Sequence, residues 1–482
     1  MTAASLAQHF RGTNLSISLI ESPEIDTVGV GEATTPTIRN FYKSLGMNDE
    51  QVLTATNGTC KLGIKFDGWL NESSSFIHPF GSFGQDLKNV NFIHYWLKAK
   101  SLGSQTKFDE YSLGCMLAHN NKFSQPIPNP QSSLAVFDWA LHLDAKLFAN
   151  HLKEYAIERD VKHHSDTIEH VGLKKDSGYI DSLTLASGKT ITADFFIDCS
   201  GFRSVLIGKA LGVPYIDWSE LLLCDSAYFA PSASTKPTPP YTQVTARTAG
   251  WQWRIPLQHR TGNGYVYSSK FIDDETAKTE LLANLEDVMD EPKFIRFTPG
   301  RREKSWYKNC VAIGLSSGFL EPLESTSIAL IETAIERVKQ LFPTNGFDPY
   351  IIDEYNEVSA LEYERVRDFI ILHYKLNQRK DSEFWSKCRA MDIPDTLDKK
   401  INLYKHRGYF LRYRWEMFHP ASWQAIYSGF NLYPKSYDLS VDSLPNDYLT
   451  TSLNAMKESV TNFVTNAKDH DDFLRTYKRD KT

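Results

Sequence analysis

A short run with two tryptophans, Trp251-Gln252-Trp253-Arg254-Ile255-Pro256, constrains the fold more than any other stretch of the sequence. In an extended strand, residues two apart point to the same side, so Trp251 and Trp253 would form one rigid apolar wall. Pro256 donates no backbone hydrogen bond and is therefore expected to end the strand. The spacing alone favours ordinary core packing of two large rings, and a role at a binding site needs support from the rest of the chain.

The composition describes a large globular chain without a strongly basic surface. Its 482 residues are 41% hydrophobic, and 53 Lys plus Arg against 59 Asp plus Glu give a net charge of −6, which argues against a nucleic-acid partner. No apolar run approaches the roughly 18 residues of a membrane span, and the N-terminus lacks the basic region of a signal peptide. Six scattered cysteines without a C-x-x-C pair predict neither a metal site nor a disulfide framework, and they fit a cytoplasmic protein.

The N-terminal segment has the pattern of half a dinucleotide-binding unit. Residues 2–10 predict an amphipathic helix, and residues 15–20 predict a strand that ends at Glu21. In a βαβ unit, a carboxylate at this position accepts a hydrogen bond from a ribose hydroxyl. The sequence has no strand and no G-x-G-x-x-G loop before the helix, so either the natural chain begins further upstream or the chain is a non-catalytic remnant that has lost its dinucleotide.

Small-residue turns elsewhere are also expected near a nucleotide. The run Gly29-Val30-Gly31-Glu32-Ala33-Thr34-Thr35-Pro36 lets backbone approach a ligand, and its proline suits the first turn of a helix at 37–45. Residues 193–199 predict a buried strand that runs into a turn at Ser200 and Gly201. For the run at 29–36, a plain glycine-rich turn is the alternative.

The segment 60–69 alternates cleanly and predicts a single strand. Leu62, Ile64 and Phe66 share one face, and Lys61 and Lys65 share the other. The pattern alone favours a half-buried strand with a solvated lysine face. Farther along the chain, residues 137–160 predict one helix, and residues 222–270 predict antiparallel strands with a hairpin turn at 262–264.

An amphipathic helix is predicted to begin after Ser325, with Ser325 or Thr326 as its cap. Free N–H groups and partial positive charge at a helix N-terminus make a site for an anion. On the pattern alone, Glu324 is best explained as a charge that stabilises this helix end.

Three motifs together give a resemblance. Trp-x-Trp-x-Ile-Pro and Gly-Val-Gly-Glu-Ala-Thr-x-Pro resemble signatures of the flavin-dependent halogenases, the tryptophan-halogenase family, and Asp-x-x-Ile-Asp-x-Ser-Gly resembles the second FAD motif of flavoproteins at large. The resemblance covers nearly the whole chain. It implies an α/β fold of the FAD-binding two-dinucleotide-domain type, similar to glutathione reductase and the aromatic hydroxylases. Residues 1–345 would bind FAD, with a substrate sheet inserted at about 205–300, and residues 346–482 would form a helical substrate-binding cap.

The resemblance also implies roles for individual residues. Lys65 maps onto the catalytic lysine and Glu324 onto the second catalytic residue. Trp251 and Trp253 would separate flavin from substrate, with His78 and Phe80 near the substrate and halide near Thr326 and Ser327. FAD contacts are expected at Glu21, Gly29, Val30, Gly31, Glu32, Ala33, Thr34, Ser200, Gly201, Gly314 and Ser325.

The activity implied is halogenation of an electron-rich aromatic with FADH2, O2 and halide, through hypohalous acid. A separate flavin reductase would supply the reduced flavin, and a homo-oligomer is one of the states left open. Free tryptophan is not expected as the substrate, because Phe418-His419-Pro420-Ala421-Ser422-Trp423 resembles members that act on simpler indoles and phenols. A flavin-dependent aromatic monooxygenase is the alternative enzyme.

Overall fold

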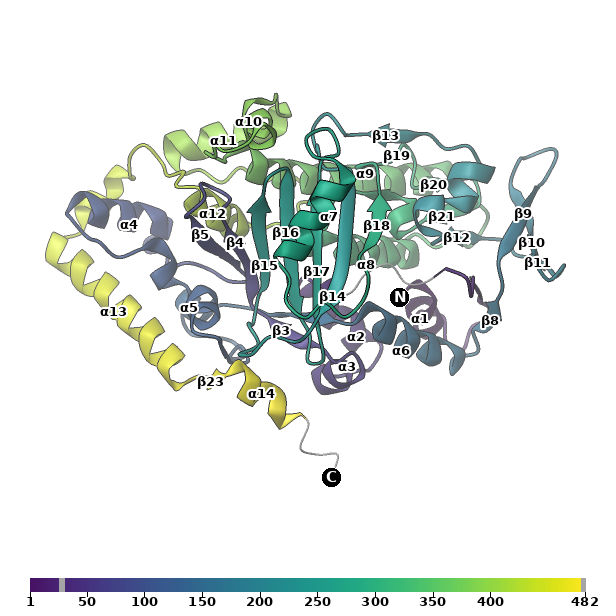
Figure 1. Cartoon of the computed structure of the whole chain (residues 1–482), viewed down its shortest axis with the longest axis horizontal. Helices are drawn as coiled ribbons and strands as arrows, with labels where there is room; N and C mark the ends of the chain where they lie inside the picture. Colours follow the sequence, from purple (N-terminus) through teal and green to yellow (C-terminus); the bar gives the residue numbers. More distant parts are fainter. Residues whose placement is uncertain (26–30, 478–482) are drawn as a thin grey trace.

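A computed structural model describes residues 1–25 and 31–477, and its centre is a seven-stranded sheet (Figure 1). The strand order is β18-β14-β17-β16-β15-β4-β5, and all neighbours are antiparallel except β15 and β4. The strands are β4 (Gly63–Asp67), β5 (Ser75–Pro79), β14 (Ser226–Ser232), β15 (Thr242–Arg247), β16 (Gly250–Pro256), β17 (Thr261–Tyr267) and β18 (Lys293–Arg296).

The tryptophan run forms β16, as predicted, and Pro256 is its last residue. The predicted hairpin turn was wrong, because residues 262–264 lie inside β17 and the chain reverses at 257–260, where Leu257 N–H donates to the Arg260 carbonyl. Position 264 inside the strand requires glycine, because a larger side chain would collide with a neighbouring ring. It lies opposite Trp253, and a Cβ at Gly264 would come within 2.1 Å of the Trp253 ring.

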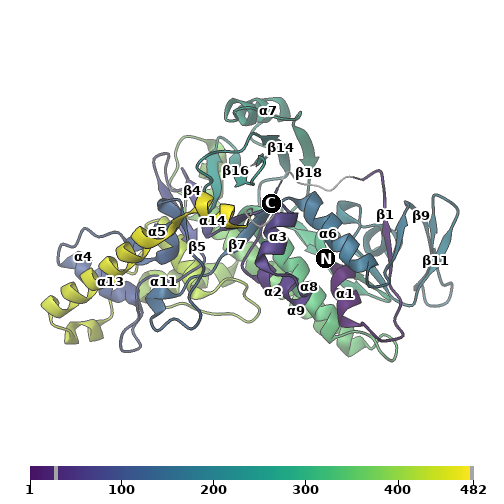
Figure 2. The same cartoon turned by 90° about the horizontal axis from the view of Figure 1, so that it is seen from below.

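The nucleotide-type elements lie together on one side of the molecule (Figure 2). Helix α1 (Thr2–His9) precedes β1 (Ser18–Glu21), which pairs in parallel with β8 (Lys162–Ser165). Strand β12 (Phe196–Asp198) pairs in parallel with β21 (Cys310–Ala312), which also pairs with β20 (Trp306–Tyr307). A meander of β9 (Ile168–Leu173), β10 (Ile180–Leu185) and β11 (Thr190–Thr192) projects beyond them.

Two sequence-based element boundaries were wrong. Residues 137–160 do not form one helix: β7 (Ala140–Leu143) comes first, and Asp144 then caps α6 (Ala145–Ile157) by accepting from Lys146 N–H at 3.0 Å. Residues 60–69 do not form one strand. Strand β3 (Thr59–Lys61) joins β7 and β2 (Glu32–Ala33) in a separate sheet, and β4 begins at Gly63. Leu62 lies between the two strands, where its N–H donates to the Pro240 carbonyl and its carbonyl accepts from Phe80 N–H.

Helices cover the sheet and build the C-terminal part (Figures 1 and 2). Helix α13 extends along one edge beside α5, and the short strand β23 (Lys468–Asp469) pairs with β6 (Lys122–Phe123) before the last helix. In the part of the chain that the structure describes, no helix is long and apolar enough to cross a membrane. The helices are α2 (Thr37–Ser44), α3 (Asp49–Ala55), α4 (Phe92–Ser101), α5 (Leu113–His119), α7 (Asp274–Ala283), α8 (Thr326–Gln340), α9 (Pro349–Lys375), α10 (Glu383–Ala390), α11 (Asp395–Arg407), α12 (Pro420–Gly429), α13 (Asn446–Asn466) and α14 (His470–Thr476).

One of the hydrophobic cores joins the central sheet to the C-terminal helices. Ile64 and Phe66 of β4 and Trp251 of β16 belong to the same buried cluster as Phe369 of α9 and Trp385 of α10. Burial of this apolar area holds α9 against the sheet, so residues from both places meet at one site.

Candidate active site

A fully buried lysine, Lys61, lies at the centre of the site. It is the last residue of β3, and its ammonium donates to the Thr34 carbonyl at 2.9 Å and to Ser325 Oγ at 2.8 Å. The ring of Phe80 lies 5.1 Å from Nζ. Burial lowers the pKa of Lys61 to about 7, although the charge of Glu324 acts in the opposite direction. The amine and ammonium forms of Lys61 are therefore both populated near neutral pH.

Glu324 and Ser325 both have a left-handed backbone, which non-glycine residues rarely adopt. Their φ values are 66° and 60°, and both side chains are buried. Such strain persists only where surrounding contacts fix it, and it is typical of functional sites. Here the two side chains are held by partners distant in the sequence. Ser325 accepts from Lys61, 264 residues away, and Glu324 is held by two histidines.

The carboxylate of Glu324 bridges His78 and His373. His78 Nδ1 lies 2.8 Å from Oε2, and His373 Nε2 lies 2.8 Å from Oε1. Burial alone would raise the pKa of Glu324, but the two imidazoles outweigh that effect and hold the pKa well below its usual range. Glu324 is thus a buried carboxylate that remains ionised, beside a lysine of lowered pKa.

The resemblance mapped the catalytic lysine onto Lys65, but the structure places Lys65 outside this site. Its side chain is 26% exposed, and its Nζ lies 3.3 Å from Asp67 Oδ1 on the same strand. The prediction that Lys61 lies on a solvated strand face was also wrong, because Lys61 is completely buried. Because the chain moves from one sheet to another at Leu62, the two lysines do not share a strand face.

The structure brings five of the predicted site residues together around Lys61 and Glu324: Thr34, His78, Phe80, Glu324 and Ser325. It also adds His373, which was not predicted from the sequence. A signal for His373 was present, because it follows a run of apolar residues on α9, Phe369-Ile370-Ile371-Leu372, all of which are buried. No comparable signal distinguished Lys61 from Lys65.

The two tryptophans of β16 form one wall, as their spacing predicted. Their ring centroids are 6.1 Å apart, and Trp251 is almost completely buried. Trp69 connects this wall to the site, since its ring lies 6.2 Å from Trp251 and 6.2 Å from His373. Glu321 lies behind the wall, where burial raises its pKa to about 8 and the Tyr374 hydroxyl donates to it at 2.8 Å.

Ser325 precedes α8 but does not cap it with its side chain, and the predicted cap was wrong in this respect. Its hydroxyl accepts from Lys61 instead. Thr326 is buried and Ser327 is half-buried in the first turn of α8, where backbone N–H groups carry partial positive charge. This helix N-terminus adjoins the Lys61 site through Ser325.

Several predicted nucleotide contacts lie where strands of the parallel pairs end. Gly201 has φ +67°, and a Cβ built there meets nothing within 4 Å. It follows β12, and Gly314 follows the neighbouring β21. The buried Asp198 fixes the turn that follows β12, because its carboxylate accepts from the N–H groups of Ser200 and Leu206.

The remaining predicted nucleotide contacts are Glu21 and residues of the segment 29–33. Glu21 ends β1 and pairs with Lys153 and His163, at 3.2 and 3.0 Å. Glu32 and Ala33 form β2, where burial raises the pKa of Glu32 to about 7. Gly31 packs against β16, and Gly29 and Val30 lie outside the described residues.

A carboxylate at a strand end, an open glycine turn and a helix N-terminus are the features that bind a dinucleotide, so these residues fit FAD. Among residues 1–25 and 31–477, no cluster of His, Cys, Asp and Glu could hold a metal ion. The six cysteines, all within those ranges, are free.

Comparison with known proteins gives close matches along most of the chain. The family profile described as tryptophan halogenase matches residues 1–446. Tryptophan 6-halogenase SttH of Streptomyces toxytricini is 36% identical over 430 residues, covering 84% of this chain and 81% of that protein. Tryptophan 7-halogenase RebH of Lentzea aerocolonigenes is 32% identical over 432 residues, covering 84% and 79%.

Solved structures agree with the sequence matches. BrvH, a flavin-dependent halogenase from Brevundimonas sp. BAL3, has a TM-score of 0.96 at 53% identity, covering 99% of this chain and 96% of its own. Xcc4156, a flavin-dependent halogenase from Xanthomonas campestris, has a TM-score of 0.95 at 39% identity, covering 99% and 95%. The predicted FAD-binding α/β fold is therefore confirmed.

Proposed function

The chain belongs to the tryptophan halogenase family and is an FADH2-dependent enzyme that halogenates an aromatic substrate with halide, and we propose that Lys61 and Glu324 carry out its halogen transfer. One observation carries this proposal: a completely buried lysine whose pKa lies near 7, beside a buried carboxylate. A structural lysine gains nothing from such a site, because burial penalises its charge. A lysine that must meet a reactive species away from water does gain from it.

When bound, reduced FAD would supply hypohalous acid from O2 and halide. As an ammonium, Lys61 donates a hydrogen bond to that acid and makes the halogen more electrophilic. As an amine, it attacks the halogen: the N–X bond forms, the O–X bond breaks, and a nitrogen proton leaves with the hydroxide as water. The Thr34 carbonyl and Ser325 hydroxyl orient Nζ in either form, at 2.9 and 2.8 Å.

Glu324 is the base for the proton that leaves the aromatic ring. The ring intermediate of an electrophilic substitution is strongly acidic, so a carboxylate of lowered pKa is basic enough. His78 and His373 fix both carboxylate oxygens and keep the group ionised. In this assignment the two histidines are positioning residues for Glu324.

Residues 1–345 are proposed to hold FAD, with the substrate sheet inserted at about 205–300. The proposed contacts of FAD are Glu21, the segment 29–34, the turn at Ser200 and Gly201, Gly314 and Ser325. Halide is placed at the first turn of α8, near Thr326 and Ser327, because the partial positive charge there suits an anion. Trp251 and Trp253 separate the flavin from the substrate, so that the oxidant formed on one side reaches Lys61 on the other.

The substrate is proposed to be an indole- or phenol-like aromatic, bound between His78, Phe80 and the helical part at 346–482. Chloride, bromide and iodide are all candidate halides. We place the enzyme in the cytoplasm with a separate flavin reductase as its partner. The matched tryptophan 6- and 7-halogenases support the choice of an indole ring.

The test compares two lysines that the sequence pattern did not separate. Lys61→Met and Lys65→Met are assayed with indole, O2, a flavin reductase and each halide, and products are identified by mass. Loss of Lys61 should lower halogenation about 10²- to 10⁴-fold, the range for a positioned catalytic group. Loss of Lys65 should change it less than about 3-fold, because that side chain pairs with Asp67 outside the site.

The reverse result, with Lys65 essential and Lys61 dispensable, would overturn the assignment. The pH dependence of wild-type turnover separates the two forms of Lys61. Activity that falls as pH rises through about 7 indicates the ammonium, and activity that rises indicates the amine. Oxygenated product without halide would instead support a monooxygenase.

A further inference from the structure

Helix α14, near the C-terminal end of the chain, returns to the strand that carries Lys61 (Figure 1). The helix lies beyond residues 1–446, the range that the family profile matches. Pairing of β23 with β6 brings it there. Its first residue, His470, is 1% exposed. The Nε2 atom of His470 lies 3.2 Å from the backbone nitrogen of Cys60, which is 410 residues away and directly precedes Lys61.

The two ring nitrogens of His470 have opposite roles. The Cys60 N–H can only donate, so Nε2 is the acceptor. Nδ1 lies 2.9 Å from the Thr238 carbonyl, which can only accept, so Nδ1 carries the proton. One neutral tautomer therefore satisfies both bonds. Burial lowers the pKa of His470 to about 4, which keeps the ring in this form at neutral pH.

Strand β3 lies at the edge of its sheet, whose order is β2-β7-β3. A buried N–H on the outer side of an edge strand needs an acceptor from elsewhere in the fold. His470 supplies that acceptor for Cys60. The Leu62 N–H donates to the Pro240 carbonyl at 2.7 Å. The N–H groups before and after Lys61 are thus both held by segments distant in the sequence.

The loop that contains Pro240 is itself fixed by α14. His470 donates to the Thr238 carbonyl in this loop, and Asp471 accepts from the Thr238 N–H at 3.2 Å. Asp471 also accepts from Lys236 Nζ at 2.7 Å. These two charges act on the pKa of His470 in opposite directions. We call His470 and Asp471 the C-terminal clasp.

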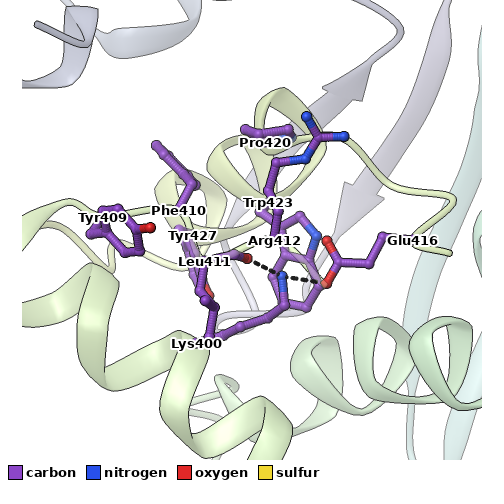
Figure 3. A pocket seen from close by; sticks show the side chains of 9 residues that line it. All are labelled: Lys400, Tyr409, Phe410, Leu411, Arg412, Glu416, Pro420, Trp423 and Tyr427. Carbon is purple, nitrogen blue, oxygen red and sulfur yellow. Dashed lines mark hydrogen bonds and ion pairs between the residues drawn. The ribbon is translucent and has the colours of Figure 1, made fainter. Parts of the chain in front are cut away.

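The position of Lys61 depends on its strand more than that of a lysine in an ion pair. Lys400, which is also buried, has its Nζ 2.7 Å from Glu416 Oε1 (Figure 3). The ammonium of Lys61 instead donates to a carbonyl and a hydroxyl, and neutral acceptors hold an ammonium less strongly than a carboxylate does. A displacement of β3 would therefore lengthen both bonds of Lys61.

We propose that His470 is a positioning residue for Lys61, which it places by holding the Cys60 N–H. The role in halogen transfer rests on the proposed function, whereas the contact with β3 does not. Without His470, the Cys60 N–H would be buried and unpaired, and β3 would shift to satisfy it. Lys61 would then lose acceptors that favour its ammonium, so its pKa would fall.

The test compares two replacements of His470 in halogenation of indole, measured in single turnovers across a range of pH. His470→Leu removes both ring nitrogens. It should slow the reaction at least about 10-fold and move the limb of the pH–rate profile near 7 to lower pH by about half a unit. His470→Gln keeps an oxygen near the place of Nε2 that can accept from Cys60. It should stay within about 3-fold of the wild type, with the limb unmoved.

Leu474→Ala is the matched control for these variants. Leu474 is a buried residue of α14, so the substitution weakens the packing of the helix and leaves the hydrogen bond of His470 to β3 in place. The limb of this control should stay at the wild-type pH. A limb that stays in His470→Leu, or that moves equally in the control, would overturn the proposal.

Hydrogen exchange, resolved to single amides by mass spectrometry, gives a readout without turnover. In the wild type, the Cys60 amide should exchange at least about 10²-fold more slowly than an unprotected amide. His470→Leu should lose that protection, and Leu474→Ala should keep it. A Cys60 amide that is unprotected in the wild type refutes the proposal even if no variant folds. If exchange behaves as expected but the wild type halogenates no aromatic, the proposed function fails and the contact of His470 with β3 stands.

Discussion

Replacing Lys61 by methionine tests whether this ammonium is held where its charge is disfavoured. Methionine keeps much of the length of the side chain and removes the charge. The pKa of Lys61 is lowered from 10.5 to about 7 in the folded protein because of burial. The unfolded chain keeps a lysine pKa of about 10.4, so between pH 7 and 9 the folded protein releases a proton that the unfolded chain retains.

The sign and size of the effect follow from that difference. Stability rises with pH wherever the unfolded state binds more protons, so Lys61 adds stability as pH rises above 7. In the folded protein, Lys61 is half protonated at pH 7 and nearly deprotonated at pH 9, and over this range the free energy of unfolding increases by about 2 kcal/mol. The variant Lys61→Met has no titrating group at this position. The wild type should therefore gain about 2 kcal/mol relative to the variant over this pH range.

The assay is urea unfolding of both proteins at pH 7, 8 and 9, followed by tryptophan fluorescence. Other titrating groups are present in both proteins and cancel in the difference. Lys65→Met is the matched control, since its Nζ lies beside Asp67 and its side chain is 26% exposed. Its difference from wild type should not change with pH. A pH-independent difference for Lys61→Met would show that its ammonium is not desolvated, and the reasoning would fail.

Three further substitutions test the site. Glu324→Gln removes the buried negative charge between two imidazoles and should lower single-turnover halogenation at least about 10²-fold while flavin binding persists. Ser325→Ala removes an acceptor that favours the ammonium of Lys61, so the limb of the pH–rate profile near 7 should move to lower pH. Ser327→Gly removes a half-buried side chain from the first turn of α8. In a competition between chloride and bromide it should shift products towards bromide, because the larger anion gains room; an unchanged product ratio would count against a halide site there.

Local patterns in the sequence determined much of the fold. The tryptophan strand, the strand ending at Glu21, the strand before Ser200 and the helix after Ser325 all depend on alternation, on punctuating glycine and proline, or on helical periodicity. Such signals involve residues close together in the chain. They therefore survive in any fold that buries the same apolar faces, and together with the motifs they were enough to identify the family.

Only the tertiary structure decided which lysine belongs to the site. Alternation assigned Lys61 and Lys65 to one face, but burial of a side chain depends on what packs over it. The groups that enclose Lys61 come from Thr34, Phe80 and Ser325, the last 264 residues away. At Leu62, where the chain changes sheet, the hydrogen bonds to Pro240 and Phe80 likewise join distant segments. A pattern of period two carries no information about such contacts, whereas the folded chain assembles them and thereby sets the charge state of Lys61.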